Sequence, residues 1–255
     1  MLIVYVALMV AGLIGIIVCQ KKQKTNPNAQ TIAFLFLILI LVGAGGTLYE
    51  TGIFGGDREM EQIMGNEITF AKARSQVLAE YAGQKWNGQT AVILVEPGNE
   101  KNQIAKAGLD TMEAALKKAG LNVSIDTLNI PQSDEGEPAM INAKIYNEAF
   151  AKNKAANVFV LMASLPFDPQ EVSKLDCWKF DPKKARVIVT NAEIFNLKGV
   201  IAKGLVGAAI ASKAGYDPEK PAPKEYKAAF DTRYILITPE NLKEVAAKHA
   251  DLFAK

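Results

Sequence analysis

The sequence predicts an α/β protein in which two N-terminal transmembrane helices precede a domain built on a five-stranded, doubly wound parallel sheet. Three observations lead to this fold class. Residues 2–19 and 31–48 are apolar runs, each about 18 residues long, without a charged side chain. After residue 88, short apolar segments alternate with segments of helical periodicity. Most of the short segments are solidly apolar, which is typical of strands covered on both faces.

The two apolar runs predict membrane-spanning helices. At about 1.5 Å of rise per residue, about 18 residues reach across most of a hydrocarbon core that is roughly 30 Å thick. A cleaved signal peptide is the alternative for the first run, but its basic residues should precede the apolar run, and here Lys21 and Lys22 follow it. We therefore expect residues 1–49 to form a transmembrane hairpin with the lipid bilayer as a permanent partner.

The segment between the runs indicates the orientation. QKKQKTNPNAQ carries three lysines and no acidic residue. The positive-inside rule places it in the cytoplasm, which makes the chain a two-pass protein of the cell (inner) membrane with extracytoplasmic N- and C-termini. The small residues at 43–46 allow close packing against the first helix or a partner, or else mark a frayed helix end. Residues 50–88 then predict a linker and an amphipathic juxtamembrane helix, because apolar residues recur at helical spacing between residues 58 and 83.

Residues 89–255 predict a Rossmann-like α/β domain. Strands are expected at residues 91–95, 122–127, 158–163, 186–190 and 234–238. The alternating segment at 122–127 suits a sheet edge, which favours the strand order 2-1-3-4-5 with right-handed crossovers. Thr238 is expected to cap the final helix. The helix before the last strand is expected to end near residue 215 and to present one apolar face, made by Ile194, Leu197, Ile201, Leu205 and Ala208.

This strand order predicts where a ligand would bind. Open parallel sheets bind ligands beyond the carboxyl ends of the strands, where the strand order reverses, and here that point falls between the first and third strands. The loops at this edge offer polar groups and one flat apolar ring, from Glu96, Asn99, Ser164, Phe167, Asp168 and Asn191. The alternative is that Asn99, Asn191 and Thr238 are helix N-caps and that the prolines at 166 and 169 only shape a loop.

Composition argues against several kinds of chemistry. VEPGNEKNQ matches neither common phosphate-binding loop, so we expect no nucleotide or flavin cofactor. The single histidine, His249, has helical spacing with apolar neighbours and is expected to pack, which leaves no catalytic triad, and two cysteines far apart predict no metal site. Without the three lysines of the hairpin loop, 26 basic and 27 acidic residues nearly cancel, so no nucleic-acid partner is expected.

Residues 90–125, TAVILVEPGNEKNQIAKAGLDTMEAALKKAGLNVSI, resemble the opening of type I periplasmic (sugar-type) binding proteins. In that family a strand, a loop with an asparagine or aspartate, and a helix ending before a glycine open the first of two lobes. The resemblance implies that residues 89–255 correspond to one lobe and present half of a binding cleft. A second copy or another subunit would be needed to close such a site.

These features lead to two expectations for function. The first is a membrane-anchored extracytoplasmic protein that acts as a non-enzymatic interaction or ligand-sensing subunit, with other membrane subunits or copies of itself as partners. The second is a solute-binding receptor for a small polar molecule, sugar-like or amino-acid-like, held near Asn99 and Asp168. An enzyme that uses a carboxylate of these loops is a third alternative.

Overall fold

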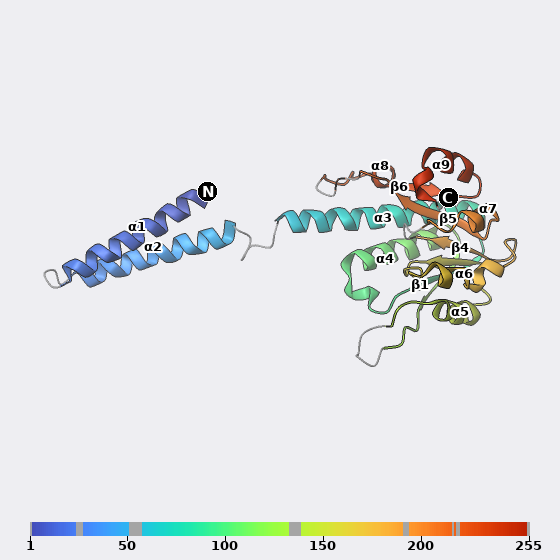
Figure 1. The fold of residues 1–255 in the computed structure, drawn as a ribbon, viewed down its shortest axis with the longest axis horizontal. Coiled ribbons are helices and arrows are strands. Elements are labelled where there is room, and N and C mark those ends of the chain that lie inside the picture. Colours follow the sequence, from blue (N-terminus) through green and yellow to red (C-terminus); the bar gives the residue numbers. More distant parts are fainter. Residues whose placement is uncertain are drawn as a thin grey trace. The chain divides into compact units, whose positions relative to one another are not determined.

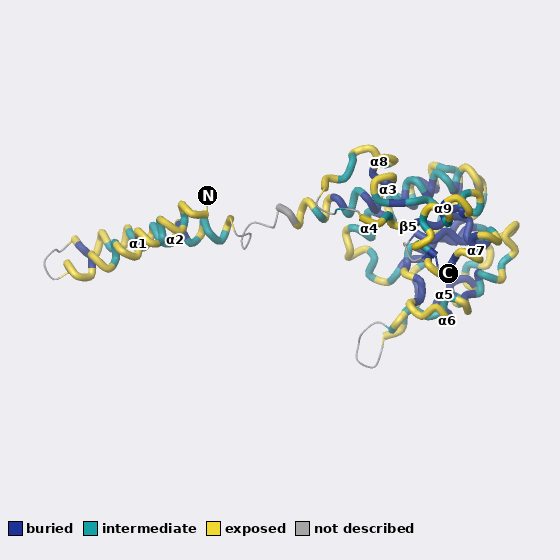
Figure 2. Tube along the Cα trace, turned by 45° about the horizontal axis from the view of Figure 1, so that its top comes forward, coloured by how far each residue is buried: buried dark blue, intermediate teal, exposed yellow. Residues whose placement is uncertain are grey.

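The computed structural model describes residues 2–23, 28–50, 58–132, 139–190, 194–215, 217 and 220–253. It contains two compact units, Met1–Ile63 and Met64–Lys255, whose elements are labelled in Figure 1. The first unit is a helical hairpin and the second is a three-layer α/β unit. Figure 2 shows that the buried segments of the second unit gather in the sheet between its helices.

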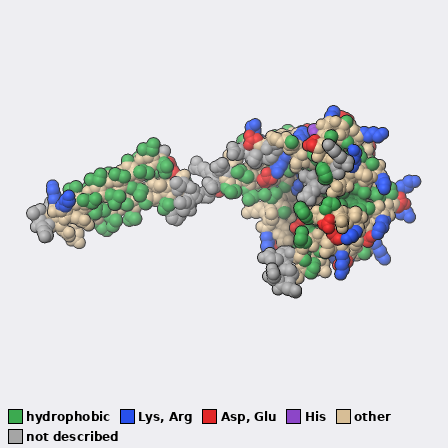
Figure 3. All heavy atoms as spheres, in the orientation of Figure 1, with side chains coloured by type: hydrophobic (Ala, Val, Ile, Leu, Met, Phe, Trp, Pro, Cys, Tyr) green, Lys and Arg blue, Asp and Glu red, His purple; other side chains and the backbone are tan. Residues whose placement is uncertain are grey.

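The hairpin consists of α1 (Leu2–Lys22) and α2 (Ala29–Glu50), and both helices are long and apolar enough to cross a membrane. Glycines let the helices approach closely: a Cβ on Gly12 would lie 2.6 Å from Ile40, and one on Gly43 would lie 2.8 Å from the Tyr5 carbonyl oxygen. Gly43 and Gly46 therefore pack against α1, one of the alternatives that the sequence left open, whereas Gly45 faces away from it. Figure 3 shows hydrophobic side chains over the visible face of the hairpin.

The juxtamembrane segment forms α3 (Arg58–Trp86), a long amphipathic helix. From Phe70 onwards its apolar side chains are buried on the α/β unit, with Leu78 and Ala82 fully covered. The C-terminal part of this amphipathic helix therefore covers the domain. The helix ends at Trp86, and the turn at Gly88 leads into the first strand.

The sheet has six strands in the order β2-β1-β3-β4-β5-β6, so the fold class is confirmed with one strand more than predicted. The first five strands are parallel and the last pair is antiparallel. Four strands lie where the sequence placed them, and the predicted fifth became the sixth. The bounds are β1 Thr90–Val95, β2 Asn122–Thr127, β3 Val158–Leu161, β4 Arg186–Val189, β5 Val206–Ser212 and β6 Tyr234–Ile237.

The long helix predicted before the last strand is wrong. Only α7 (Lys198–Ala202) is helical there, and Gly204, which has φ +74°, follows in the turn after it. Such a backbone conformation favours glycine and stops a helix. The following residues form β5, buried on both faces, and a Cβ on Gly207 in this strand would lie 2.6 Å from the Trp86 ring. Small side chains are needed here because α3 crosses close above the strand.

Helices cover both faces of the sheet (Figure 1). One face packs against α3, α4 (Gln103–Lys118) and α8 (Tyr226–Arg233). The other packs against α5 (Ala143–Lys152), α6 (Pro169–Ser173), α7 and α9 (Leu242–Lys248). The predicted cap of the last helix is also wrong, because α9 begins at Leu242 and the Thr238 N–H instead donates to Oδ1 of Asn241, at 2.8 Å.

Candidate functional site

The carboxyl ends of β1 and β3 lie side by side, where the strand order reverses. Two residues that the sequence singled out meet there: Oε1 of Glu96, just after β1, accepts a hydrogen bond from the backbone N–H of Ser164, just after β3, at 2.8 Å. This bond joins the two loops that flank the reversal point. It also occupies one backbone donor that a ligand at such a crevice would otherwise meet.

Tyr146 on α5 contacts the same junction through its hydroxyl group. The sequence did not predict it as a site residue. Its hydroxyl lies 3.0 and 2.9 Å from the carbonyl oxygens of Ala163 and Ser164, to which it donates. Burial, followed by the nearby Glu96 carboxylate, raises the pKa of the Tyr146 phenol well above its usual value. The phenol is therefore a neutral donor that positions the β3 loop. A lone tyrosine beside the apolar face of a predicted helix was the only signal for it.

Asn99 follows β1 in the short 3-10 helix η1 (Asn99–Lys101). It is not the cap of α4, since Asn102 accepts from Ile104 N and Ala105 N and caps that helix. The Nδ2 atom of Asn99 is buried and finds no acceptor among the described residues. A buried donor without an acceptor costs roughly 1–3 kcal/mol, so an acceptor brought by a ligand would be favoured at this position.

Asp168 caps α6, because its Oδ1 accepts from Gln170 N at 2.8 Å. The preceding residue, Phe167, is 84% exposed, and Phe195 beyond β4 is 55% exposed. Together they line a hollow of about 200 Å³ whose other walls are Leu165, Pro166, Pro169, Val172, Asn196 and Leu197. The carboxyl edge thus carries an apolar hollow rather than a strongly charged pocket. Asn191, the remaining predicted site residue, lies outside the described residues.

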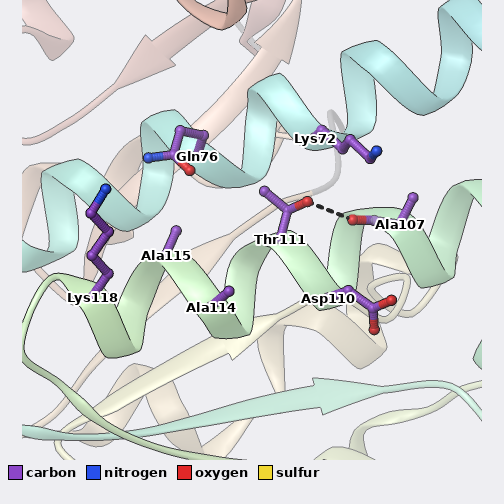
Figure 4. Close-up of a pocket in the computed structure, with 8 residues that line it drawn as sticks. All are labelled: Lys72, Gln76, Ala107, Asp110, Thr111, Ala114, Ala115 and Lys118. Atoms are coloured by element: carbon purple, nitrogen blue, oxygen red, sulfur yellow. Dashed lines mark hydrogen bonds between the residues drawn. The ribbon is translucent and has the colours of Figure 1, made fainter.

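A second hollow of about 470 Å³ lies between α3 and α4 and is shown in Figure 4. Small side chains, including Ala107 and Ala114 on α4, leave this groove open. Its polar groups do not converge on one point, and the Asp110 carboxylate is already paired with Lys106, at 2.5 Å. Because it lacks convergent unpaired groups, this groove is a weaker candidate than the carboxyl edge.

One of the two cysteines and the single histidine lie in the α/β unit and are buried to different degrees. Cys177 is fully buried, and burial raises the pKa of its thiol well above the usual value, so it stays protonated and unreactive. His249 is partly buried at the end of α9. Within the described ranges, no three His, Cys, Asp and Glu side chains gather as ligands for a metal ion.

No family model and no curated protein sequence matches this chain. Solved structures do match it. The glucose-galactose binding protein GanP of Geobacillus stearothermophilus is 15% identical with a TM-score of 0.37, over 71% of this chain and 54% of that protein. An ABC transporter solute-binding protein of Bradyrhizobium sp. BTAi1 with bound bis-tris is 12% identical with a TM-score of 0.44, over 70% of this chain and 53% of that protein. The myo-inositol binding protein of Caulobacter is 15% identical with a TM-score of 0.41, over 68% of this chain and 60% of that protein.

The predicted resemblance is confirmed. The matched proteins are of the sugar-binding and solute-binding kind that the sequence indicated. This chain spans only 53–60% of the length of these three proteins, and at this level of identity and TM-score the matches concern the general fold alone. What the domain recognises must therefore be argued from its own surface.

Proposed function

We propose that this chain is a membrane-anchored, extracytoplasmic α/β protein that acts as a non-enzymatic interaction or ligand-sensing subunit of a membrane assembly. Its recognition surface is the carboxyl edge of the sheet, at the loops that follow β1, β3 and β4. The observation that carries the proposal is the pair of exposed aromatic side chains at this edge, Phe167 at 84% and Phe195 at 55% exposure.

The loop around Phe167 supports a recognition role because it is held in shape while its ring stays in water. Pro166 and Pro169 restrict the backbone on either side, and Asp168 fixes the start of α6. Burying a phenylalanine side chain contributes about 1.5–3 kcal/mol. The ring gains this free energy only when a partner or ligand covers it, which favours an interaction site over a structural role.

The solute-binding receptor is the second candidate, and a specific observation favours it. Asn99 Nδ2 is a buried donor that lacks an acceptor among the described residues, and it lies at the same edge as the Glu96–Ser164 junction. Hydroxyl and carboxylate oxygens are acceptors that would satisfy it. A small polar molecule could therefore bind beside the aromatic hollow, with the junction opening to free the Ser164 N–H.

Site-specific photo-crosslinking tests the interaction proposal. A photoreactive phenylalanine analogue at position 167 is expected to join the chain to a defined companion in native membranes. The control is the same analogue at Met140, which is 74% exposed and lies before α5. Equal cross-linking from both positions, or none from 167, contradicts a recognition role for this edge.

Thermal-shift screening of the full chain with polar metabolites tests the receptor candidate. A true ligand raises the unfolding temperature of the native chain and has a smaller effect on Asn99→Ala and Phe167→Ala. Losing the contacts of a covered Phe167 ring should weaken binding roughly 10- to 100-fold, the equivalent of about 1.5–3 kcal/mol. If no compound raises the unfolding temperature, the receptor candidate fails and the interaction candidate stands.

The anchoring and orientation have a separate test. Under the positive-inside rule the hairpin lysines predict that the α/β unit lies outside the cytoplasm. A cysteine at the exposed position Lys184 should then react with a membrane-impermeant reagent in intact cells. Protection of this cysteine until the cells are opened would place the domain inside and overturn the extracytoplasmic proposal.

A further inference from the structure

The two edges of the sheet differ in how their outward backbone groups are satisfied. At β6, pairing with β5 in the register Ala211↔Ile235 turns the backbone groups of Tyr234 and Leu236 away from the sheet. Nδ2 of Asn241 donates to Leu236 O at 2.9 Å, and the Tyr234 N–H donates to Phe230 O. The outward N–H of Tyr234 and the outward C=O of Leu236 are therefore occupied by the chain itself, which hinders pairing with another strand at this edge.

Among the described residues, no strand pairs with β2 at the opposite edge of the sheet. The N–H of Asn122 donates to Gln89 O at 3.0 Å, and the N–H of Leu128 donates to Val95 O at 2.9 Å. The backbone N–H and C=O groups of the even-numbered residues of β2 therefore point towards β1. The period of two then turns the N–H and C=O groups of Val123 and Ile125 outward. Neither residue has a backbone partner on that side among the described residues. The strand also lacks the proline, lysine or bulge with which proteins usually block an exposed edge.

We propose that β2 pairs antiparallel with β2 of a second copy of this chain, so that the two sheets join across a two-fold axis at Ile125. In this register the two Ile125 residues form a hydrogen-bonded pair, and Val123 of each copy lies opposite Thr127 of the other. A two-fold axis pairs the backbone groups of a strand with the same groups of its copy, so an unpaired strand is complementary to itself. The copy is also present at the same concentration as the chain that it pairs with.

The side chains of β2 suit this pairing. Ile125 is 40% exposed, and the axis places it against its own copy as an apolar cross-strand pair. Asp126 would lie opposite Ser124 of the other copy, so no carboxylate faces a carboxylate. Its charge is already offset by Lys152 at 2.5 Å and by the Asn153 amide at 2.6 Å, and these neighbours hold the pKa of Asp126 below its usual value.

The hairpin favours this association for a further reason. Two helices able to span a membrane hold copies in one plane, which raises their effective concentration and lets a short backbone interface suffice. This surface is distinct from the aromatic hollow, so Phe167→Ala should leave self-association unchanged. The two proposals can therefore fail independently of each other.

The decisive variant is Ile125→Pro, because the N–H that it removes points away from β1, so pairing with β1 is kept. The variant loses both the outward hydrogen bond and the Ile125 side-chain contact of the proposed dimer. Proline is tolerated in edge strands when its N–H side faces solvent. The full chain in detergent is expected to be dimeric by sedimentation, and Ile125→Pro should raise the dimer dissociation constant at least tenfold while native tryptophan fluorescence is retained. Ile125→Lys, which keeps the N–H but places two like charges together, should dissociate the dimer even if the proline variant does not fold.

Disulfide trapping tests the register. In a hydrogen-bonded antiparallel pair the Cα atoms lie about 5.5 Å apart, within disulfide range. Ile125→Cys in a Cys19→Ser background should give a cross-linked dimer under mild oxidation, whereas Lys184→Cys should not. A chain that is monomeric at all concentrations, an Ile125→Lys variant that stays dimeric, or equal cross-linking at 125 and 184 overturns the proposal, as does trapping of a different polypeptide at position 125.

Discussion

Two glycines in neighbouring helices should respond in opposite ways to the same substitution. Gly83 on α3 lies against the end of α4, where a Cβ would come within 2.4 Å of the Ala119 Cβ and 3.1 Å of its carbonyl oxygen. Gly108 on α4 has room, because a Cβ there would lie 3.6 Å from Ala71 and 3.7 Å from Ser75 Oγ, at ordinary van der Waals separations. Each position is inside a helix and each variant is glycine to alanine.

The magnitudes follow from helix propensity and packing. Alanine stabilises a helix interior by about 1 kcal/mol relative to glycine, and Gly108→Ala should show this gain in full. At Gly83 the same gain is opposed by overpacking against backbone, which costs about 1–3 kcal/mol, so a net loss of up to about 2 kcal/mol is expected. For a domain of this size the unfolding temperature should rise by about 2–4 °C in Gly108→Ala and fall by up to about 8 °C in Gly83→Ala.

The assay can use the full chain in detergent, because both tryptophans, Trp86 and Trp178, lie in the α/β unit. Their fluorescence reports unfolding of that unit and not of the hairpin. Shifts of the same sign in the two variants would refute the packing of α3 on α4, since propensity alone raises the stability of both.

Three further predictions test other parts of the structure. Asn241→Leu removes two hydrogen bonds to the edge of β6 and should cost roughly 2–3 kcal/mol and increase light scattering on heating; an unchanged unfolding temperature contradicts the edge protection. The Lys85 ammonium group donates to Glu240 and lowers the pKa of that carboxyl to about 2, below its ordinary value of 4.5. The contribution of the Lys85–Glu240 pair to stability is therefore present above pH 4.5 and is lost as the pH falls towards 2. Lys85→Met should therefore reduce the difference in unfolding temperature between pH 6 and pH 3. In the hairpin, Gly43→Ile should separate α1 from α2 and expose the hairpin to protease in detergent, whereas Gly45→Ile, which has no neighbour within 4 Å, should not.

Most elements of the fold could be predicted because their signals are local. β3 and β4 are runs of buried apolar residues, and β2 alternates as an edge strand does. Gly120, which has φ +88°, follows the end of α4 in the left-handed conformation that is typical of helix C-termini. Each of these features depends on neighbours within a few residues, so the sequence alone carries it.

β5 could not be predicted because its apolar spacing is ambiguous. Ile201, Leu205 and Ala208 recur as on a helix face, yet Gly204 separates the short α7 from a strand of small residues. Whether Val206 to Ser212 extend depends on the space left between α3 and the rest of the sheet, and on Trp86 lying over Gly207. The added strand also reverses β6, which pairs antiparallel where a parallel strand was expected.

The candidate site divides in the same way. The loops after β1 and β3 were located by strand order alone, and the polar character of Glu96 and Ser164 was visible in the sequence. Their hydrogen bond, the support from Tyr146 and the missing acceptor of Asn99 were not, because each depends on atoms brought together from separate segments.

By itself, the sequence determined that the chain begins with two helices able to span a membrane and continues as an α/β domain. Transfer of long apolar runs from water to lipid, and burial of short ones in a sheet, depend on composition and local periodicity. Only the tertiary structure decided which edge of the sheet is protected, which aromatic rings stay in water, and which polar groups meet at the carboxyl edge. These properties depend on the relative positions of residues far apart in the chain, and those positions are set by the packing of the whole domain.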